Sequence, residues 1–567
     1  MRTLPLLLLV LVGSLGVGLG LRVMGTAGVA KPPAAAKAAV YRNGVPQGHV
    51  YTGCSEEPDD VNPFTSHNQV ARRLVLGYTH EGLLDVDPAT GELRPSLAAK
   101  FELAADGSVC DFTLREGVRF ADGAPVTLDD VLFGWDLAAA GHLALGFVAD
   151  TYARVRAVER LDDRSFRLHF RDRHYAMLRV VGETWLVAQK KFFVDRVAAR
   201  CHPQPAPAVA SAEFATWLSQ IRTECGPGTG PYQLQNDPNG PLAWHSRKDL
   251  LLVPNEHSWR RLAAPGTWNF AGIRLLWRDQ AGATNALLRG EVDWFSSQML
   301  SELLQARPEL AKNATRLVYD YEMLGVFRTV WKCTDGPCAD VRVRRALGML
   351  FDIDSILQGC EGTAVRAFAH AKVGSKAYPT DVTPLRFDVA QARSLLREAG
   401  YDPEQGKPLR LVVVALQGTD VLRRIADLFA DAASKAGIQL DLRRRDYAAY
   451  MQEKKVDDWH GVVVQQLFRP SGDPFDFVHS KGVDNEGHWA NAEVDRLATA
   501  AREEFDEERR GALWREMHAI VYREQPVAFL MHPLASVLLD RRIEGAVPGR
   551  TGLVVERAFV APDRQRQ

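Results

Sequence analysis

Few residues of this sequence have the types and spacing that catalysis or metal binding requires. His142, His169, His174 and His202 do not share the spacing of zinc ligands on one helix face, so they predict no zinc site. The stretch GPGTGPY at residues 226–232 lacks the Lys-Ser/Thr of a phosphate-binding loop, and we interpret it as a turn. The sequence also has no Gly-x-Ser-x-Gly elbow and no cysteine in a recognisable catalytic context. We therefore expect no catalytic residue, no metal and no cofactor, and we predict that the protein is not an enzyme.

Length and composition favour a globular protein with more than one lobe. The chain has 567 residues, more than a single hydrophobic core usually supports. Hydrophobic residues make up 46% and charged residues 25%, the ordinary balance of a globular protein. Lys and Arg number 69 against 70 Asp and Glu, so the formal net charge of -1 creates no field that would attract nucleic acid. We expect no nucleic-acid partner.

The N-terminus, residues 1–30, is predicted to be an export signal that is either cleaved or kept as a membrane anchor. Arg2 precedes an apolar run at residues 4–21, and small residues follow where a signal peptidase could cut. The run is close to the roughly 20 residues that span a bilayer, so an uncleaved membrane anchor is the alternative to a cleaved signal. Residues 31–47 begin with KPPAAAKAA and predict a Pro/Ala linker that would act as a tether. We expect the rest of the chain in the periplasm or on the extracellular face of the cytoplasmic membrane.

The seven cysteines are consistent with an exported protein, where disulfides persist. One preferred pair brackets the turn TDGP, and another brackets a Pro-rich segment. The two preferred pairs and one further possible pair are Cys333–Cys338, Cys201–Cys225 and Cys54–Cys110. Pairing cannot be deduced from sequence alone, and several buried thiols without disulfides are the alternative.

Strands and helices are signalled along the whole chain. Residues 101–120 alternate apolar and polar side chains around Asp106-Gly107, which predicts a β-hairpin, and residues 155–170 predict a second one. Thr127 is a candidate N-cap for a helix that follows. After residue 340, helical and strand patterns alternate, which indicates an α/β lobe with its own sheet.

Eight segments of the chain also resemble, in order, those of a known protein family. They are EEPDDVNPF (56–64), EGLLDVDPATGELRPSLAAKFE (81–102), DGSVCDFTLREGVRFADGAPVTLDDVLF (106–133), GTGPYQL (228–234), GEVDW (290–294), DVRVRRALGMLFDID (340–354), ARSLLREAGY (392–401) and NAEVDRLATAARE (491–503). The family is the family 5 extracellular solute-binding proteins, which includes dipeptide, oligopeptide and nickel binders. The resemblance covers almost everything after the linker.

This resemblance implies an α/β fold of the type II periplasmic-binding-protein kind, with two α/β lobes closing on a cleft and a third, smaller lobe. The implied boundaries are 48–88 for the first part of lobe I, 89–225 for lobe II, 226–318 for the second part of lobe I, 319–524 for lobe III, and 525–567 for the return to lobe I and the C-terminal tail. Closure of the lobes would enclose the ligand without breaking any bond.

The implied function is that of an extracytoplasmic solute-binding protein of an ABC-type importer, which captures a peptide or similar small solute. Its partners would be that ligand and the permease subunits of the transporter, and the chain would be a monomer. The alternative is a membrane-anchored sensory or scaffold protein that reuses the fold.

Candidate ligand contacts also come from the resemblance. Thr65, Ser66 and His67 match a segment that faces the cleft in relatives, although His67 could equally cap the next helix. Relatives that bind peptides usually place an aspartate four residues before the proline of a late Asp-Pro step, and this chain has Pro470 there. Asp473 or Asp476 could substitute for that aspartate after a shift of the loop.

Cationic and aromatic side chains complete the candidate site. Arg469, and Arg328 at a position where relatives usually have an Asn nearby, would suit a carboxylate or phosphate of the ligand, or would pair with acids of the protein. Trp331, Phe468 and Trp489 are candidate aromatic walls of the cleft, with core packing as the alternative.

Overall fold

In a computed structural model, most strands of the chain belong to three sheets. The structure describes residues 40–42, 45–67, 71–146, 148–234, 244–296, 300–320, 324–360, 362–417, 419–468, 471–550 and 552–565. Met1–Ala39 is a unit separate from Val40–Gln567. The predicted signal or anchor and the first part of the predicted linker lie outside the described residues. The last part of that linker contributes two paired strands, β1 (Val40–Arg42) and β2 (Val45–Gln47). Within the described ranges, no helix combines the length and the apolar character that a membrane crossing needs.

A four-stranded antiparallel sheet with the order β6-β7-β9-β8 contains both predicted hairpins. Its elements are β6 (Ala98–Leu103), β7 (Val109–Leu114), α2 (Leu128–Ala140), α3 (Ala149–Ala153), β8 (Val155–Arg160), β9 (Ser165–Phe170), α4 (Met177–Thr184), α5 (Lys190–Cys201) and α6 (Ala212–Leu218). Gly107 has a φ of 71° in the turn between β6 and β7, a conformation that glycine adopts without strain. Thr127 and Asp130 form a capping box at the start of α2, as Thr127 predicted.

An eight-stranded mixed sheet has the order β10-β12-β13-β3-β14-β22-β15, with β11 paired to β12. Its strands are β3 (Val50–Ser55), β10 (Tyr232–Leu234), β11 (Trp244–His245), β12 (Asp249–Pro254), β13 (Gly272–Trp277), β14 (Trp294–Ser296), β15 (Ala314–Tyr319) and β22 (Ala535–Asp540). The helices that accompany it are η1 (Ala71–Leu76), α1 (Gly77–Thr79), α7 (Trp259–Ala263), α8 (Gln280–Leu288), α9 (Leu300–Ala306) and α10 (Leu310–Asn313). Strand β3 is parallel to both β13 and β14, so it lies in the middle of the sheet.

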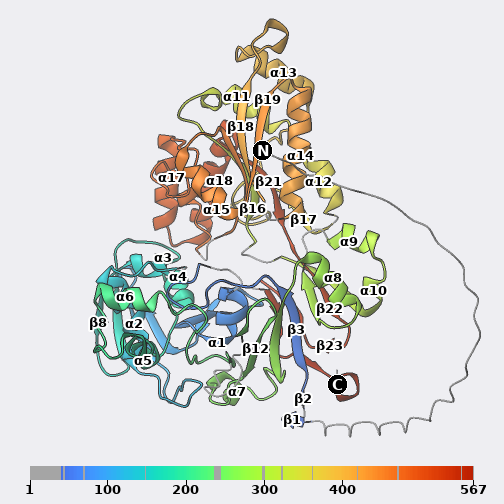
Figure 1. Ribbon diagram of the computed structural model, residues 1–567. Coiled ribbons are helices and arrows are strands. Elements are labelled where there is room, and N and C mark those ends of the chain that lie inside the picture. The colour runs from blue at the N-terminus through green and yellow to red at the C-terminus, as the bar shows by residue number, and fades with distance from the viewer. Residues whose placement is uncertain are drawn as a thin grey trace, which may run out of the picture. The chain divides into compact units, whose positions relative to one another are not determined.

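A six-stranded sheet has the order β17-β21-β16-β20-β18-β19. Its strands are β16 (Val326–Trp331), β17 (Ala364–Arg366), β18 (Arg410–Leu416), β19 (Gln439–Arg445), β20 (Gly461–Gln466) and β21 (Val527–Pro533). Its helices are η2 (Pro337–Ala339), α11 (Val341–Gly348), α12 (Ile353–Gly359), α13 (Val389–Glu398), η3 (Pro403–Gln405), α14 (Asp420–Lys435), α15 (Tyr447–Val456), α16 (Phe475–Val478), α17 (Ala492–Glu503) and α18 (Glu507–Glu524). One hydrophobic cluster joins the strands to α11–α14, and another joins them to α17 and α18. Figure 1 shows α14 on one side of these strands and α17 and α18 on the other, so helices cover both faces.

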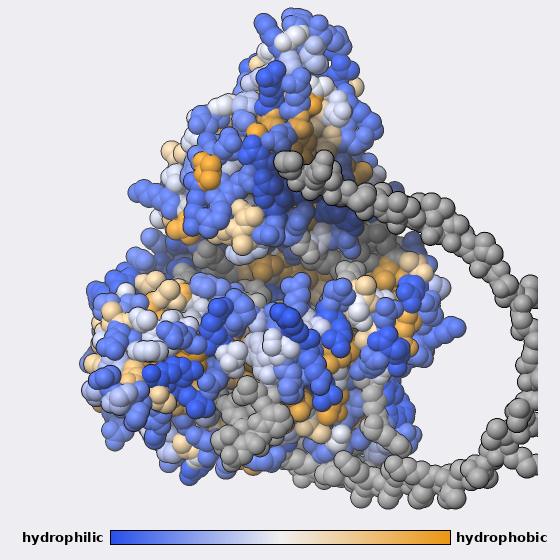
Figure 2. Space-filling model, viewed as in Figure 1, coloured by the Kyte–Doolittle hydropathy of each residue, from blue (hydrophilic) through white to orange (hydrophobic). Residues whose placement is uncertain are grey.

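The remaining strands form short antiparallel ribbons. They are β4 (Leu84–Val86) with β5 (Leu93–Pro95), β23 (Ile543–Glu544) with β26 (Phe559–Val560), and β24 (Val547–Gly549) with β25 (Gly552–Val554), followed by η4 (Pro562–Arg564). On the face seen in Figure 2, most of the surface is hydrophilic and apolar residues form small patches. Such scattered apolar side chains are normal on folded proteins.

The described strands pass between the eight-stranded and the six-stranded sheet twice. β15 of the first sheet is followed by β16 of the second, and β21 is followed by β22 with only Leu534 between them. Two-way crossing of this kind is expected where two lobes close on a ligand.

The prediction of disulfides is wrong, because all seven cysteines are free thiols in the structure. Cys201 and Cys225 are both buried as free thiols and belong to different hydrophobic clusters. Cys338 is buried in the cluster under α11–α14 and Cys333 packs against the same cluster, but the Cys333 thiol donates to the carbonyl oxygen of Trp331 at 3.2 Å and forms no disulfide. The alternative of buried thiols without disulfides therefore describes the structure.

Candidate functional site

A pocket of about 620 Å³ lies against the eight-stranded sheet, next to the two crossings between sheets. Leu324, just before β16, and Leu534, between β21 and β22, both line it. Pockets that hold small molecules usually measure about 300–1,000 Å³, so this one is large enough for a solute of several residues or rings.

Aromatic side chains form one part of the pocket's lining. Tyr51 of β3 stacks on Phe270 with ring centroids 4.7 Å apart, and Trp294 of β14 lies 6.5 Å from Tyr51. Tyr78 of α1 and Trp268 meet edge to face at 6.3 Å. Because these rings are held by one another, they present a preorganised surface to flat or apolar parts of a ligand.

The position of Trp294 depends on Gly53. The two residues are parallel partners in β14 and β3. A Cβ atom built on Gly53 would lie 2.1 Å from Cε2 of the indole ring, closer than any real contact. Gly53 is therefore a packing requirement of the pocket, and any side chain there would displace the ring.

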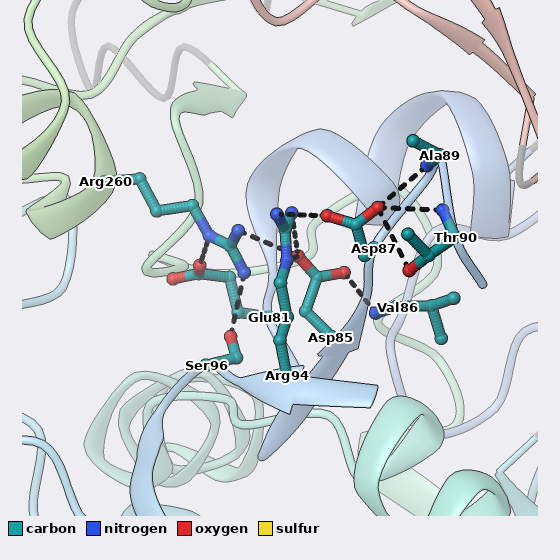
Figure 3. Close-up of polar contacts among 9 residues, drawn as sticks. All are labelled: Glu81, Asp85, Val86, Asp87, Ala89, Thr90, Arg94, Ser96 and Arg260. Carbon is teal, nitrogen blue, oxygen red and sulfur yellow. Dashed lines mark hydrogen bonds and ion pairs between the residues drawn. The ribbon is translucent and has the colours of Figure 1, made fainter. Parts of the chain in front are cut away.

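A network of charged side chains forms another wall of the pocket (Figure 3). Arg260 of α7 ion-pairs with Glu81, donates to the Asp85 Oδ2 atom at 2.8 Å, and donates to the Ser96 hydroxyl at 2.9 Å. Arg94 of β5 donates to the same Asp85 Oδ2 atom at 2.8 Å. Residues far apart in sequence thus share one carboxylate.

These contacts fix the charge state of the network. Burial opposes ionisation of Asp85, but Arg260 and Arg94 outweigh it and lower the pKa of its carboxyl. Burial also opposes the charge on Arg260, but Glu81 and Asp85 raise its pKa. Each charge of this wall is therefore matched by an opposite charge of the protein.

The whole lining is balanced in charge. Four arginines and four carboxylates line the pocket, namely Arg72, Arg73, Arg94, Arg260, Glu81, Asp85, Glu183 and Glu556. His80 also lines it, and burial lowers its pKa to about 4, so it is neutral at pH 7. An environment with both signs and no net excess suits a zwitterionic or neutral solute better than one with a single net charge.

The predicted contacts near residue 65 have structural partners. The Thr65 hydroxyl donates to Asp60 Oδ2 at 2.9 Å, and the buried Ser66 hydroxyl donates to the Asp60 carbonyl oxygen at 2.9 Å. The His67 side chain is exposed. None of the three lines the 620 Å³ pocket, so their role as ligand contacts stays a prediction.

Three predicted residues of the six-stranded sheet region are buried. Trp331 has 0% exposure and Trp489 has 8%, and each belongs to a hydrophobic cluster. Arg328 has 1% exposure; it donates to Gln466 Oε1 at 3.2 Å and lies over the ring of Phe477. Their surroundings favour the alternative of core packing for the two tryptophans.

The carboxylate of Asp473 contacts two other side chains. Its carboxylate accepts from Arg502 Nε at 2.6 Å and lies 3.1 Å from His174 Nε2. It joins the segment between β9 and α4 to the loop after β20. Phe468 lines a second, smaller pocket, and Arg469 and Pro470 lie outside the described residues.

The charged wall was not predicted as a site. Glu81, Asp85 and Arg94 all lie in one segment of the family resemblance, 81–102, which was used only to identify the family. The signal that this segment offered was three charged residues among the apolar ones in and next to the β4–β5 ribbon. Arg260 had no local signal, because its partners are more than 160 residues away.

The fold and the pocket define a class: binding proteins of the type II periplasmic kind, in which α/β lobes enclose a solute. The chain is similar to the oligopeptide-binding protein AppA from Bacillus subtilis solved with a nonapeptide, with a TM-score of 0.74 and 19% identity over 91% of this chain and 99% of that one. It is 24% identical to the probable deoxycholate-binding periplasmic protein YgiS of Escherichia coli (strain K12), over 85% of this chain and 88% of that protein. It is 22% identical to AppA of Bacillus subtilis (strain 168), over 80% of each.

Residues 92–487 match the model of the bacterial extracellular solute-binding proteins, family 5. The chain belongs to this family, as its eight segments predicted. Proteins of the family bind solutes for ABC-type importers, and this function, rather than a sensory or scaffold role, is the one that the family assigns.

Proposed function

We propose that this chain captures a peptide or a similar zwitterionic solute in the 620 Å³ pocket and delivers it to an ABC-type importer. The observation that carries the ligand class is the charge balance of the lining, with four arginines against four carboxylates. A peptide with free ends carries one charge of each sign, and its side chains can pack on the rings of Tyr51 and Trp294.

The remaining parts of the proposal follow from export. The apolar run at residues 4–21 supports delivery across the cytoplasmic membrane, with the chain released to the periplasm or kept at the membrane by its N-terminus. We propose a monomer that catalyses no reaction and contacts the permease subunits. Mass spectrometry of the mature N-terminus distinguishes the released form from the tethered one.

Calorimetry with purified protein tests the ligand class. Short peptides of graded length with free ends are expected to bind, and the same peptides with an acetylated N-terminus and an amidated C-terminus are expected to bind more weakly. Absence of binding across the panel would contradict the proposal. Equal affinity of the free and blocked peptides would contradict the zwitterion argument alone.

Tryptophan fluorescence places the ligand. Trp268 and Trp294 line the pocket, so a bound peptide is expected to change their emission. Trp268→Phe is expected to reduce this change. Trp217→Phe in α6, outside the pocket, is the matched control and is expected to leave the change intact.

A further inference from the structure

The segment between β9 and α4 contacts the part of the molecule that carries the six-stranded sheet. His174 Nε2 lies 3.1 Å from Asp473 Oδ2, and the Tyr175 hydroxyl donates to the carbonyl oxygen of Ser471 at 2.5 Å. The side chains of His174 and Asp473 are 0% and 2% exposed, so water is excluded from their contact. The two parts therefore meet in a packed interface.

Tyr175 makes further contacts across this interface. Its main-chain N–H donates to the carbonyl oxygen of Arg502, near the end of α17, at 3.0 Å. Its ring lies edge to face with Trp514 of α18 at 5.4 Å, and the Arg510 guanidinium lies 4.1 Å from the centroid of the same ring. Tyr175 thus binds α17, α18 and the loop at Ser471 together.

The two sides of this interface are not neighbours along the chain. After β9 of the four-stranded sheet, the described chain passes through β10–β15 of the eight-stranded sheet before it enters the six-stranded sheet at β16. The four-stranded sheet is tied to the eight-stranded one, because Leu84 packs in its hydrophobic cluster and the adjoining Asp85 binds Arg260 of α7. A change of orientation between the eight-stranded and six-stranded sheets would therefore separate Tyr175 from α17 and α18.

Each side of the interface keeps its charges matched when the two sides part. The Ala176 N–H donates to His174 Nδ1 at 3.0 Å, so the hydrogen of the neutral ring is on Nε2 and points to Asp473. Burial outweighs the Asp473 carboxylate and lowers the pKa of His174, so the ring is neutral at pH 7. Asp473 keeps Arg502, which lies on its own side, as its cation. Separation therefore breaks no ion pair, and the interface can open and close reversibly.

Helix α4 joins this interface to the pocket of about 620 Å³. The helix begins two residues after Tyr175, and its last residues, Glu183 and Thr184, line the pocket. A Cβ built on Gly82, another lining residue, would lie 2.7 Å from the carbonyl oxygens of Gly182 and Glu183. The end of α4 thus lies directly against the main chain of the pocket wall. A solute that shifts this wall acts on the helix that follows the interface segment.

We propose that residues 173–175 form a latch, which closes on α17, α18 and the loop at Ser471 when a solute occupies the pocket and which slows release of that solute. This role rests on the proposed function, because it needs a solute in the 620 Å³ pocket. The two crossings between sheets permit the motion, whereas the latch sets how long the closed form lasts.

Amide hydrogen exchange reports on the latch directly. The N–H of Tyr175 has the Arg502 carbonyl oxygen as its acceptor only when the latch is closed. With the tripeptide Ala-Phe-Ala at saturating concentration, this amide is expected to exchange more slowly than in the ligand-free protein, while the amides of β16 are equally protected in both. Binding of the tripeptide without a change at Tyr175 would overturn the latch and leave the proposed function standing.

Tyr175→Phe removes the hydroxyl and keeps the ring that contacts Arg510 and Trp514. Because the bond to the Ser471 carbonyl oxygen exists only in the closed form, this variant is expected to release the tripeptide about fivefold faster, with an unchanged association rate. Stopped-flow tryptophan fluorescence measures both rates. Tyr447→Phe on α15, where the side chain is 67% exposed, is the matched control. Equal release rates for the two variants would overturn the latch.

Gly107→Asn tests the latch by a steric route. Gly107 has a φ of 71°, which Asn tolerates, and a Cβ there would lie 2.6 Å from the ring of Phe505, between α17 and α18. The Arg173 guanidinium covers the same ring at 5.0 Å. The Asn side chain is expected to hold the latch open, so that the Tyr175 amide exchanges faster. Gly141→Asn is the matched control, because Gly141 has the same φ and nothing lies within 4 Å of a Cβ there.

The two Asn variants also separate failure of the latch from failure of the proposed function. If no peptide binds, the proposed function is wrong, and exchange in the ligand-free protein tests the latch alone. Molecules that close without a solute protect the Tyr175 amide, so it is expected to exchange faster in Gly107→Asn than in Gly141→Asn. Equal exchange of this amide in the two variants would overturn the latch.

Discussion

The indole ring of Trp294 lies across the main chain of Gly53, with no room for a Cβ atom between them. Gly53→Ala is therefore expected to displace the ring and to destabilise the protein by about 1–3 kcal/mol, the usual cost of overpacking. Urea denaturation measures the stability, and peptide titration measures the loss of affinity.

A double variant provides the control for this relationship. Trp294→Phe shortens the ring that Gly53 faces, so Gly53→Ala should cost less in a Trp294→Phe background than in the wild type. If the free-energy costs of Gly53→Ala and Trp294→Phe simply add in the double variant, the two residues are not coupled in the way the packing indicates.

Arg260 joins three partners in the charged wall, so Arg260→Lys is expected to destabilise the protein by about 2–4 kcal/mol. A lysine keeps the positive charge but has a single nitrogen, which cannot reach Glu81, Asp85 and Ser96 together, so at least one of these buried or half-buried acceptors loses its donor. Thermal and urea unfolding measure the effect. Arg289→Lys alters an exposed pair with Glu291 and is the matched control, for which an unchanged midpoint is expected. Equal effects of the two variants would contradict a structural role for the wall.

Asp473 ties His174 and Arg502 together while its side chain is 2% exposed. Asp473→Asn is expected to cost about 3 kcal/mol, because it leaves Arg502 without its closest carboxylate. Asp476→Asn, which changes a longer contact of 3.7 Å to the same arginine, should cost clearly less. Denaturation in guanidinium measures the free energy of unfolding of both variants.

The same carboxyl predicts a dependence of stability on pH. Burial opposes ionisation of Asp473, but the His174 and Arg502 contacts outweigh it and lower the pKa of its carboxyl from the ordinary 3.8 to about 2. A depressed pKa contributes stability that is present above pH 4 and is lost as the pH falls through 2. Wild type should lose about 2 kcal/mol more than Asp473→Asn between pH 4 and pH 2. Parallel curves for the two proteins in urea titrations at each pH would refute this.

The cysteine chemistry is directly measurable. After unfolding without a reductant, all seven thiols are expected to react with a disulfide reagent, because no disulfide is present. In the folded protein, Cys54 and Cys333 are the partly exposed ones, and burial raises the pKa of each to about 11, so both should react slowly at pH 8. Fewer than seven reactive thiols after unfolding would mean that a disulfide exists.

Local structure was predictable from the sequence where local signals dominate. The turn at Asp106-Gly107 and the cap at Thr127 depend only on neighbouring residues, and both are present. A charged residue in an amphipathic helix usually lies on its outer face, but Arg344 is 4% exposed and donates to the carbonyl oxygen of Glu524, 180 residues away. The periodicity of apolar residues within one helix cannot predict a hydrogen-bond partner so far away in the sequence.

The site was less predictable for the same reason. Trp331 and Trp489 were candidate walls of the cleft because they are aromatic. The helices that cover the six-stranded sheet instead bury them in its core. Glu81 and Arg260 have ordinary sequence surroundings and acquire their role only when α7 folds against β4 and the residues just before it. Family resemblance identified the fold, while the partners of individual charges required three-dimensional contacts.

The single residue between β21 and β22 has a mechanical consequence. Because the strands on both sides of Leu534 are fixed in ladders of different sheets, a change in their mutual orientation must be absorbed by the torsion angles of very few bonds. The second crossing, from β15 to β16, connects the same two sheets. We expect a solute in the pocket beside Leu534 to change the angle between the two sheets, because residues next to both crossings line that pocket.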